Sequence, residues 1–413
     1  MKPLRYILCA LVAMSLAGLL QSCTFELEPG KDAGRKEVPA DKDATYLVLR
    51  IGAVGGHTRA GDGNSIEQIK SLRIVVLDED GKVEHNIRET FATTDFEAYS
   101  RENLIIPTTP TGKKIYLFAN EESVTGLNGT TGNTLTELLD SYQQKDTEGF
   151  AAAIEGAYFT PDFTQNIFLS SYYEIDAKEF EGTNRINKDF YLVRAASKFE
   201  FEFVSYLSED LTIEELTVSE VVDDMYLMPH VNDNFAPDGN MIVPAGKSYT
   251  HWIEWLKDVC DETTDTQTPV EANKNVNDKY GWILKYEIPN TAHHTLEDIL
   301  SGLGSDAKTI KANNSTAPLV LPQVYCAESK FGVEADDIQH YTFELTLKGS
   351  ATANNNDGIR KETFKFDKLS ALFRNTHVKA TITITGTAED IRLQLLIGIC
   401  PWVEETIDIP TFD

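Results

Sequence analysis

The middle of the chain carries the segment YLVRAASKFEFEF at residues 191–203, and its pattern indicates a strand. Successive side chains of a strand point to opposite faces of a sheet. Phe199, Phe201 and Phe203 therefore share one face, while the glutamates between them share the other. A strand with one apolar and one acidic face is typical of a sheet that covers a core on one side only.

The same two-residue period recurs on both sides of this segment. We expect further strands at residues 44–54, 69–77, 104–106, 115–119, 341–347, 378–385 and 391–399. The Asp80-Gly81 pair predicts a hairpin turn. One helix is expected over Thr134–Gln143, with Thr134 as its N-cap. The sequence thus predicts a mostly β fold with a few short helices.

Composition limits the classes of function. The chain has 413 residues, enough for about two domains. It carries 37 Lys and Arg against 65 Asp and Glu, a formal net charge of -28. Such a charge repels nucleic acid, and we expect no nucleic-acid partner. A hydrophobic content of 41% is too high for a disordered acidic chain.

The N-terminus has the layout of an export signal. Lys2 and Arg5 precede an apolar run at residues 6–20, which is too short for an ordinary membrane span. The sequence LLQSC at residues 19–23 resembles a bacterial lipobox, in which the cysteine is acylated and becomes the new N-terminus. We therefore expect residues 1–22 to be a lipoprotein signal peptide and Cys23 to hold the protein at a membrane surface.

Residues 24–43 are rich in charged residues, Pro and Gly, and we interpret them as a flexible tether. The strand expected at residues 44–54 comes next. Residues 55–63 hold four glycines in nine residues, which is typical of an exposed, protease-accessible loop.

The C-terminal region is apolar with strand periodicity. Leu393, Leu395, Ile397 and Ile399 share one face, and Pro401-Trp402 interrupts the ladder because proline has no amide donor. This segment is either an ordinary last strand or a strand that completes another molecule. The pattern alone leaves both possibilities open.

No catalytic or cofactor motif emerges from the sequence. The histidines lack metal-ligand spacing, and nucleophile-elbow and phosphate-loop motifs are absent. The five cysteines include no CxxC pair, and whether Cys260 and Cys326 form a disulfide is left open. Acidic residues between 223 and 240 leave a loop calcium site open, although turns use the same residue types. We expect no enzyme activity, no cofactor and no bound metal.

Several short motifs occur in an order that resembles the fimbrillin family of lipoprotein-derived subunits of type V pili. The resemblance covers essentially the whole chain after the tether, and order and spacing carry it more than any one motif. The motifs are the lipobox at Cys23, the strand at 44–54, Thr58-Arg59-Ala60, IYLFANE at 115–121, LVRAASK at 192–198, LFRNTHV at 372–378 and Pro401-Trp402.

This resemblance implies a fold and a maturation route. The fold is two tandem β-sandwich domains of the transthyretin-like fimbrillin type, at residues 60–190 and 191–390, followed by a tail at 391–413. The precursor is an outer-membrane lipoprotein carrying palmitate. A trypsin-like, arginine-specific surface protease would cleave between Arg59 and Ala60. The partners implied are other fimbrial subunits and a host or bacterial receptor for adhesion.

The residues themselves suggest a matching assembly mechanism. Cleavage would remove residues 23–59, including the strand with Leu47, Leu49 and Ile51, and leave an apolar groove with unpaired amides. The tail of a neighbouring subunit would fill it, with the donor residues Leu393, Leu395, Ile397, Ile399 and Trp402. Burial of the four aliphatic side chains contributes about 6–12 kcal/mol before entropy is subtracted. Because such insertion does not close, it generates a filament.

Two features remain open at this stage. Cys400 sits in the presumed donor segment, either as a small buried hydrophobe or because the donor begins after Trp402. The protein could also be a non-polymerising fimbrial anchor or a surface glycan-binding lipoprotein. Trp252, Trp255, Trp282 and Tyr280 are the candidate sugar-stacking residues for the second alternative.

Overall fold

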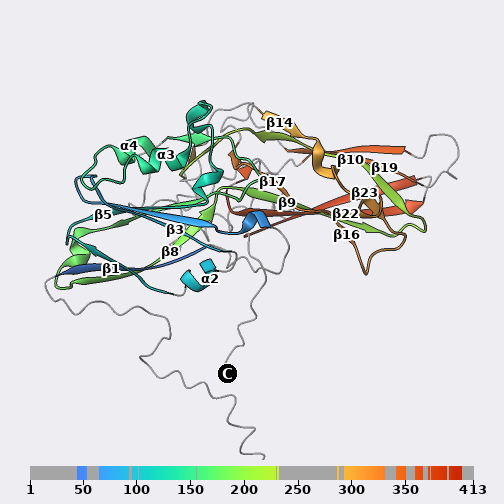
Figure 1. The fold of residues 1–413 in the computed structure, drawn as a ribbon. Coiled ribbons are helices and arrows are strands. Elements are labelled where there is room, and N and C mark those ends of the chain that lie inside the picture. The colour runs from blue at the N-terminus through green and yellow to red at the C-terminus, as the bar shows by residue number, and fades with distance from the viewer. Residues whose placement is uncertain are drawn as a thin grey trace, which may run out of the picture. The chain divides into compact units, whose positions relative to one another are not determined.

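The computed structural model is mostly β with a few short helices, which confirms the predicted fold class (Figure 1). It describes residues 44–53, 65–92, 95–100, 102–154, 156–228, 230–231, 286–287, 293–330, 341–349, 359–365, 371–372, 374–387 and 390–401.

Seven strands in the N-terminal part follow the hydrogen-bonded order β3-β2-β5-β7-β8-β1-β4. Their bounds are β1 Thr45–Ala53, β2 Ser71–Leu77, β3 Val83–Thr90, β4 Leu104–Thr108, β5 Lys113–Ala119, β7 Leu169–Ile175 and β8 Arg185–Arg194. In the part of the chain that the structure describes, β7 and β8 pair only near one end of each strand. The seven strands therefore form two layers, a β1 layer (β8-β1-β4) and a β2 layer (β3-β2-β5-β7). Side chains of both layers share one core.

Short helices cover the other face of the β2 layer. Val75 and Phe118 on that face belong to the same apolar cluster as Leu135 of α3 and Phe150 of α4. Figure 1 shows α3 and α4 on one side of β3 and β5, and β1 on the other. The helical elements are α2 Asp95–Ser100, α3 Leu135–Asp140, α4 Phe150–Ile154, and the 3-10 turns η1 Ser65–Glu67, η2 Glu121–Ser123, η3 Leu127–Gly129, η4 Ala177–Phe180, η6 Asp298–Leu300 and η7 Asp306–Lys308.

The local predictions for a turn and a helix are confirmed. Gly81 lies in the turn between β2 and β3 and has a φ angle of 78°. The Asp78 carboxylate accepts hydrogen bonds from two backbone amides of this turn. The Thr134 hydroxyl accepts a hydrogen bond from the Glu137 amide and caps α3. The α-helix ends at Asp140, which is three residues before the predicted end.

Two sheets face each other in the C-terminal part. The β10 sheet has the order β14-β10-β19-β20, with β15 also on β10, and the β9 sheet has the order β16-β9-β22-β23, with β17 also on β9. Their strands are β9 Ser197–Ser205, β10 Leu211–Val222, β14 His293–Leu296, β15 Thr309–Ile310, β16 Leu319–Val320, β17 Val324–Cys326, β19 Thr342–Lys348, β20 Ile359–Lys365, β22 Thr376–Thr387 and β23 Asp390–Pro401. Two-stranded ribbons complete the fold: β6 Tyr158–Phe159 with β11 Met225–Tyr226, β12 His230–Val231 with β13 Tyr286–Glu287, and β18 Ser329–Lys330 with β21 Ala371–Leu372.

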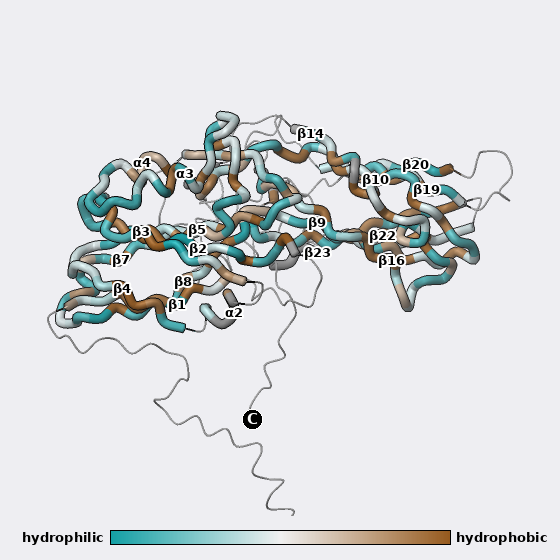
Figure 2. Tube along the Cα trace, in the orientation of Figure 1, coloured by the Kyte–Doolittle hydropathy of each residue, from teal (hydrophilic) through white to brown (hydrophobic). Residues whose placement is uncertain are grey.

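The phenylalanines of β9 form the centre of this second core, as their alternation predicts. Phe199, Phe201 and Phe203 are buried among side chains from both sheets. The rings of Phe199 and Phe343 lie 5.4 Å apart, edge to face. Apolar residues recur along β9, β19 and β22 in Figure 2.

One expectation was wrong in detail. Residues 191–203 are not one strand, because the chain leaves the first set of strands after Arg194 and enters the β9 sheet at Ser197. Ala195 and Ala196, where the chain turns from β8 to β9, are both buried. The apolar sequence pattern therefore runs on without interruption although the strand does not. The domain limits at residues 190 and 390 stay predictions.

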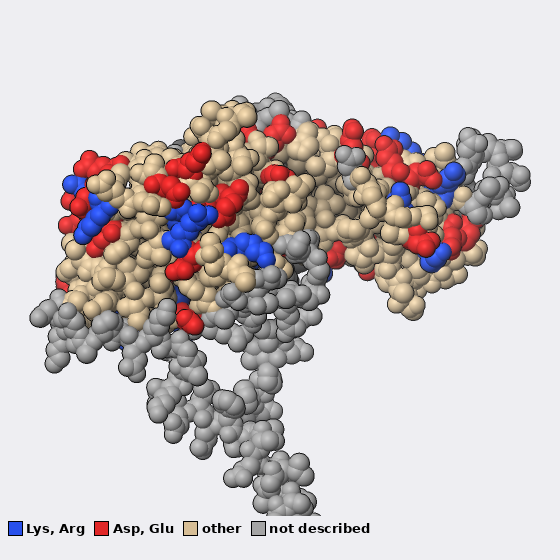
Figure 3. Space-filling view, in the orientation of Figure 1, with Lys and Arg blue, Asp and Glu red and all other residues tan. Residues whose placement is uncertain are grey.

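On the face that Figure 3 shows, charge is not confined to one patch. Figure 3 shows acidic side chains across the visible face, with basic side chains interspersed. Among the described helices, none has the length and apolar character needed to cross a bilayer.

Candidate functional site

The strand predicted to be removable, β1, is the middle strand of the β1 layer. Residues 45–49 pair antiparallel with β4, and residues 46–53 pair parallel with β8. All described pairings of β4 are with β1, and β8 has other partners only through Val193 and Arg194. Loss of β1 would therefore leave two facing strands with unpaired backbone groups, which are costly to leave unsatisfied.

β1 also supplies a row of core side chains. Leu47, Leu49 and Ile51 are at most 1% exposed and belong to one cluster with side chains of β2, β5 and β7. Full burial of a side chain of this size contributes about 1.5–3 kcal/mol, so the three together contribute about 5–9 kcal/mol. These are the residues predicted for the displaced strand, and the structure brings them together on one face.

The opposite face of β1 carries two distinctive contacts. Arg50 and Asp189 stand opposite each other across β1 and β8, with Nε–Oδ1 and Nη2–Oδ2 distances of 2.6 and 2.8 Å. Both side chains are almost half exposed, so the pair contributes at most about 1 kcal/mol. Gly52 lies beside Tyr191, where a Cβ would stand 3.6 Å from the ring. Any strand that takes the place of β1 meets this carboxylate and this ring.

The proposed processing sites, Cys23 and the Arg59-Ala60 bond, lie outside the described residues. The described chain resumes at η1, where Glu67 is 4% exposed. Its carboxylate accepts hydrogen bonds from Lys198 Nζ at 3.2 Å and from the Tyr325 hydroxyl at 2.6 Å. Because a buried carboxylate needs such partners, the chain a few residues after the predicted cleavage point is fixed to β9 and β17.

Four of the predicted donor residues lie in β23, at the edge of the β9 sheet: Leu393, Leu395, Ile397 and Ile399. Over its whole length, β23 pairs antiparallel with β22 of the same chain. Leu393 and Leu395 are partly buried against the second core, whereas Leu396 is 57% exposed on the other face. Ile397 and Ile399 continue the register, and Trp402 lies outside the described residues. Within the chain, β1 and β23 therefore belong to different sheets.

A buried polar cluster that the sequence did not reveal joins the two parts of the chain. Arg374 is fully buried and forms an ion pair with Glu328, which is 1% exposed. The same guanidinium donates hydrogen bonds to Ser170 Oγ of β7 and to the carbonyl oxygens of Tyr226 and Leu227. Arg374 lies in the LFRNTHV motif, but neither strand period nor charge pattern marks it as buried.

Two further buried groups have shifted pKa values. Burial, together with the nearby Lys198 and Lys379 ammonium groups, lowers the pKa of His377 to about 3. Burial raises the pKa of the Cys326 thiol to about 12. Cys326 is a free thiol, and its potential partner Cys260 lies outside the described residues.

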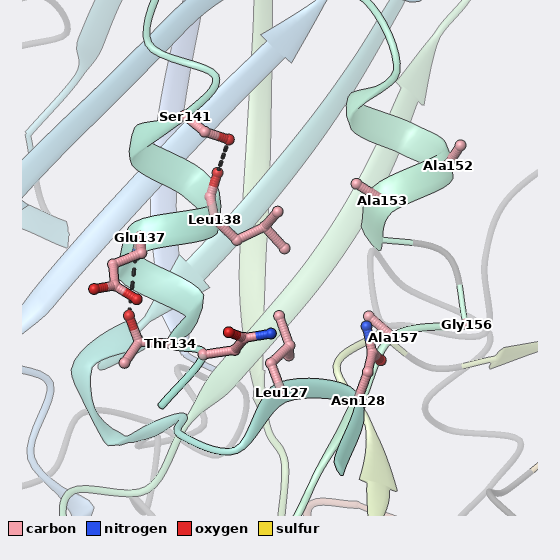
Figure 4. Close-up of a pocket in the computed structure, with 11 residues that line it drawn as sticks. Leu127, Asn128, Thr134, Glu137, Leu138, Ser141, Ala152, Ala153, Gly156 and Ala157 are labelled. Carbon is pink, nitrogen blue, oxygen red and sulfur yellow. Dashed lines mark hydrogen bonds between the residues drawn. The ribbon is translucent and has the colours of Figure 1, made fainter. Parts of the chain in front are cut away.

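A hollow of about 670 Å³ lies between α3 and α4 (Figure 4). Leu138 projects from α3 across the gap, and Ala153 lies on the side of α4 that faces α3. Polar groups at its edge include Asn128, Thr134 and Glu137. Its lining holds one carboxylate and no basic side chain, so it suits neutral or cationic groups better than anions.

In the part of the chain that the structure describes, no group of three or more His, Cys, Asp or Glu side chains could hold a metal ion. His294 instead contacts Asp223, with 2.5 Å between Nδ1 and Oδ1. The other candidate calcium ligands, at residues 233–240, lie outside the described part.

Comparison with known proteins finds one family match, in the N-terminal part of the chain. Residues 45–187 match the family of the major fimbrial subunit protein (FimA). The match begins at the first residue of β1 and ends within β8, so it includes β1, β4 and the first residues of β8. The expected fimbrillin resemblance is thus supported over residues 45–187, where the matched family is one of structural fimbrial subunits.

Solved structures similar to the chain include proteins of fimbriae. The tip fimbrial protein Mfa3 from Porphyromonas gingivalis, with a C-terminal truncation, has 12% identity and a TM-score of 0.44, over 87% of this chain and all of that one. A fimbrial assembly protein from Parabacteroides distasonis has 10% identity and a TM-score of 0.37, over 87% of this chain and 99% of that one. No curated protein sequence matches the chain significantly.

Proposed function

We propose that this protein is a structural subunit of a cell-surface fimbria that supports adhesion. It is exported as a lipoprotein through Cys23, cleaved after Arg59 and polymerised by strand exchange. The observation that carries the proposal is the position of β1 in the middle of its layer, within a region that matches a fimbrial subunit family.

The position of β1 gives cleavage a specific consequence. While β1 is covalently attached, its side chains fill the core between the β1 and β2 layers and its backbone pairs with both neighbours. After cleavage, only non-covalent contacts hold it, so an incoming strand can replace it. The lipid at Cys23 and the strand that blocks assembly then leave together.

β23 is suited to be the incoming strand because it lies at an edge. Among the described strands it has one hydrogen-bonded neighbour, β22, and Leu393 and Leu395 are only partly buried. In the place of β1 the same segment gains a second neighbour and a closed core. An edge strand therefore has more to gain by insertion than a central strand would.

The first test is the substitution Arg59→Ala in cells that carry the surface protease. We expect an intact monomer and no SDS-resistant ladder, because β1 cannot leave. Arg35→Ala, in the tether, is the matched control and should assemble normally. Ladders of normal length from Arg59→Ala would contradict the proposed gate.

A second candidate is a non-polymerising fimbrial anchor, and the complete pairing of β23 within its own sheet favours it. The mass of the protein at the cell surface separates the two functions. An N-terminus at Ala60 in filaments supports the polymerising subunit. An acylated Cys23 that persists in assembled fimbriae supports the anchor.

A further inference from the structure

Two strands of this chain share a sequence pattern. Residues 47–53 of β1 read LVLRIGA, and residues 393–399 of β23 read LQLLIGI. In the same direction and without a gap, the segments agree at four of seven positions, as L-x-L-x-I-G. Glycine is unfavourable inside a strand, so its presence at the same phase in both segments is more informative than the shared aliphatic residues.

The shared residues occupy distinct places in β1. Leu47, Leu49 and Ile51 fill the core between the two layers. Gly52 passes beside the ring of Tyr191, where a Cβ would lie in van der Waals contact at 3.6 Å. The pattern thus combines three apolar side chains for one face with a small residue for the other.

We infer that β23 of one copy enters the place of β1 in the next copy in the same direction and register. It would run parallel to β8 and antiparallel to β4, with Leu393 at the position of Leu47 and Gly398 at that of Gly52. This inference rests on the proposed strand exchange, and it specifies which residues of the two copies meet.

The register brings one exposed leucine to one carboxylate. Leu396 takes the position of Arg50, which stands opposite Asp189 on β8. In its own sheet Leu396 lies opposite Thr381 and is 57% exposed, so changing it leaves the monomer intact. Asp189 is likewise almost half exposed, and its pair with Arg50 departs with β1. A charge at position 396 therefore reports on Asp189 of the next copy.

Charge substitutions at this pair test the register in the full-length chain. The variants are Leu396→Lys, Leu396→Asp and the double variant Leu396→Asp/Asp189→Lys. Each is cleaved with an arginine-specific protease, and the rate of SDS-resistant ladder formation is then measured. Asn187→Lys combined with Leu396→Asp is the matched control. Asn187 is exposed on β8, two residues before Asp189 and on the same face.

We expect Leu396→Lys to assemble at least as fast as the wild type, because its ammonium group meets Asp189. Leu396→Asp should assemble roughly tenfold more slowly or worse, since like charges then stand directly opposite. Added to Leu396→Asp, the substitution Asp189→Lys should restore the wild-type rate of assembly, and Asn187→Lys should not.

The outcomes separate the register from the exchange itself. If wild-type ladders form but Asp189→Lys fails to rescue, or Asn187→Lys rescues equally well, the register is wrong and strand exchange stands. If the cleaved wild-type chain forms no ladder, strand exchange and this inference both fail.

Discussion

The substitution Leu49→Ala measures how much of the fold depends on β1. Leu49 is 1% exposed at the centre of the strand and packs between the β1 and β2 layers. Truncation of a buried leucine to alanine costs about 2–5 kcal/mol. Since domains are stable by only about 5–15 kcal/mol, the uncleaved chain should be strongly destabilised. After cleavage, the same loss should speed the release of β1 by about 30-fold or more, because each 1.4 kcal/mol is a factor of ten.

Chemical denaturation of the Arg59→Ala chain, with and without Leu49→Ala, measures the loss in the free energy of unfolding. The Arg59→Ala background is used because it cannot be cleaved at Arg59. Leu396→Ala is the control, and at 57% exposure it should change stability by no more than about 0.5 kcal/mol. The rate of β1 release is followed in the chain that keeps Arg59, by the time course of ladder formation after cleavage. If Leu49→Ala lowers the free energy of unfolding by less than about 1 kcal/mol, or leaves the assembly kinetics unchanged, a central role for β1 is refuted.

Two further predictions concern the buried groups. Arg374→Met should lower the free energy of unfolding by about 3–5 kcal/mol, because the buried charge of Glu328 loses its ion-pair partner. Arg374→Met/Glu328→Met should recover most of that loss. A double variant as unstable as the single one would contradict this account of the ion pair. The folded-state pKa of His377 is lowered to about 3 from an ordinary value of 6.5, so its contribution to stability is present above pH 6.5 and is lost as the pH falls toward 3. Denaturation between pH 6 and 4 should show the wild type losing about 1.4 kcal/mol per pH unit more than His377→Gln, and parallel curves would contradict the shift.

The elements that the sequence predicts correctly are those with a strong local signal. The alternating phenylalanines of β9 and the Thr134 cap of α3 depend on neighbours in the chain, and both hold in the structure. The break at Ala195 and Ala196 was missed because buried corners and buried strands use the same small apolar residues.

Strand order and buried polar contacts have no such local signal. Nothing within residues 44–54 distinguishes a central strand from an edge strand, yet β1 is central in its layer and β23 is an edge. The contact of Arg374 with Glu328 and Ser170 joins residues distant along the sequence. The repeated L-x-L-x-I-G pattern was present in the sequence, but its meaning depends on the place of Gly52 beside Tyr191.

The most direct test of the account is the peptide content of assembled fimbriae. Filaments purified from the cell surface would be dissolved, digested and examined by mass spectrometry for residues 45–53. The account predicts that this segment is missing and that residues 390–401 are present in every subunit. Filaments in which residues 45–53 are recovered in equal amount to residues 390–401 would contradict it.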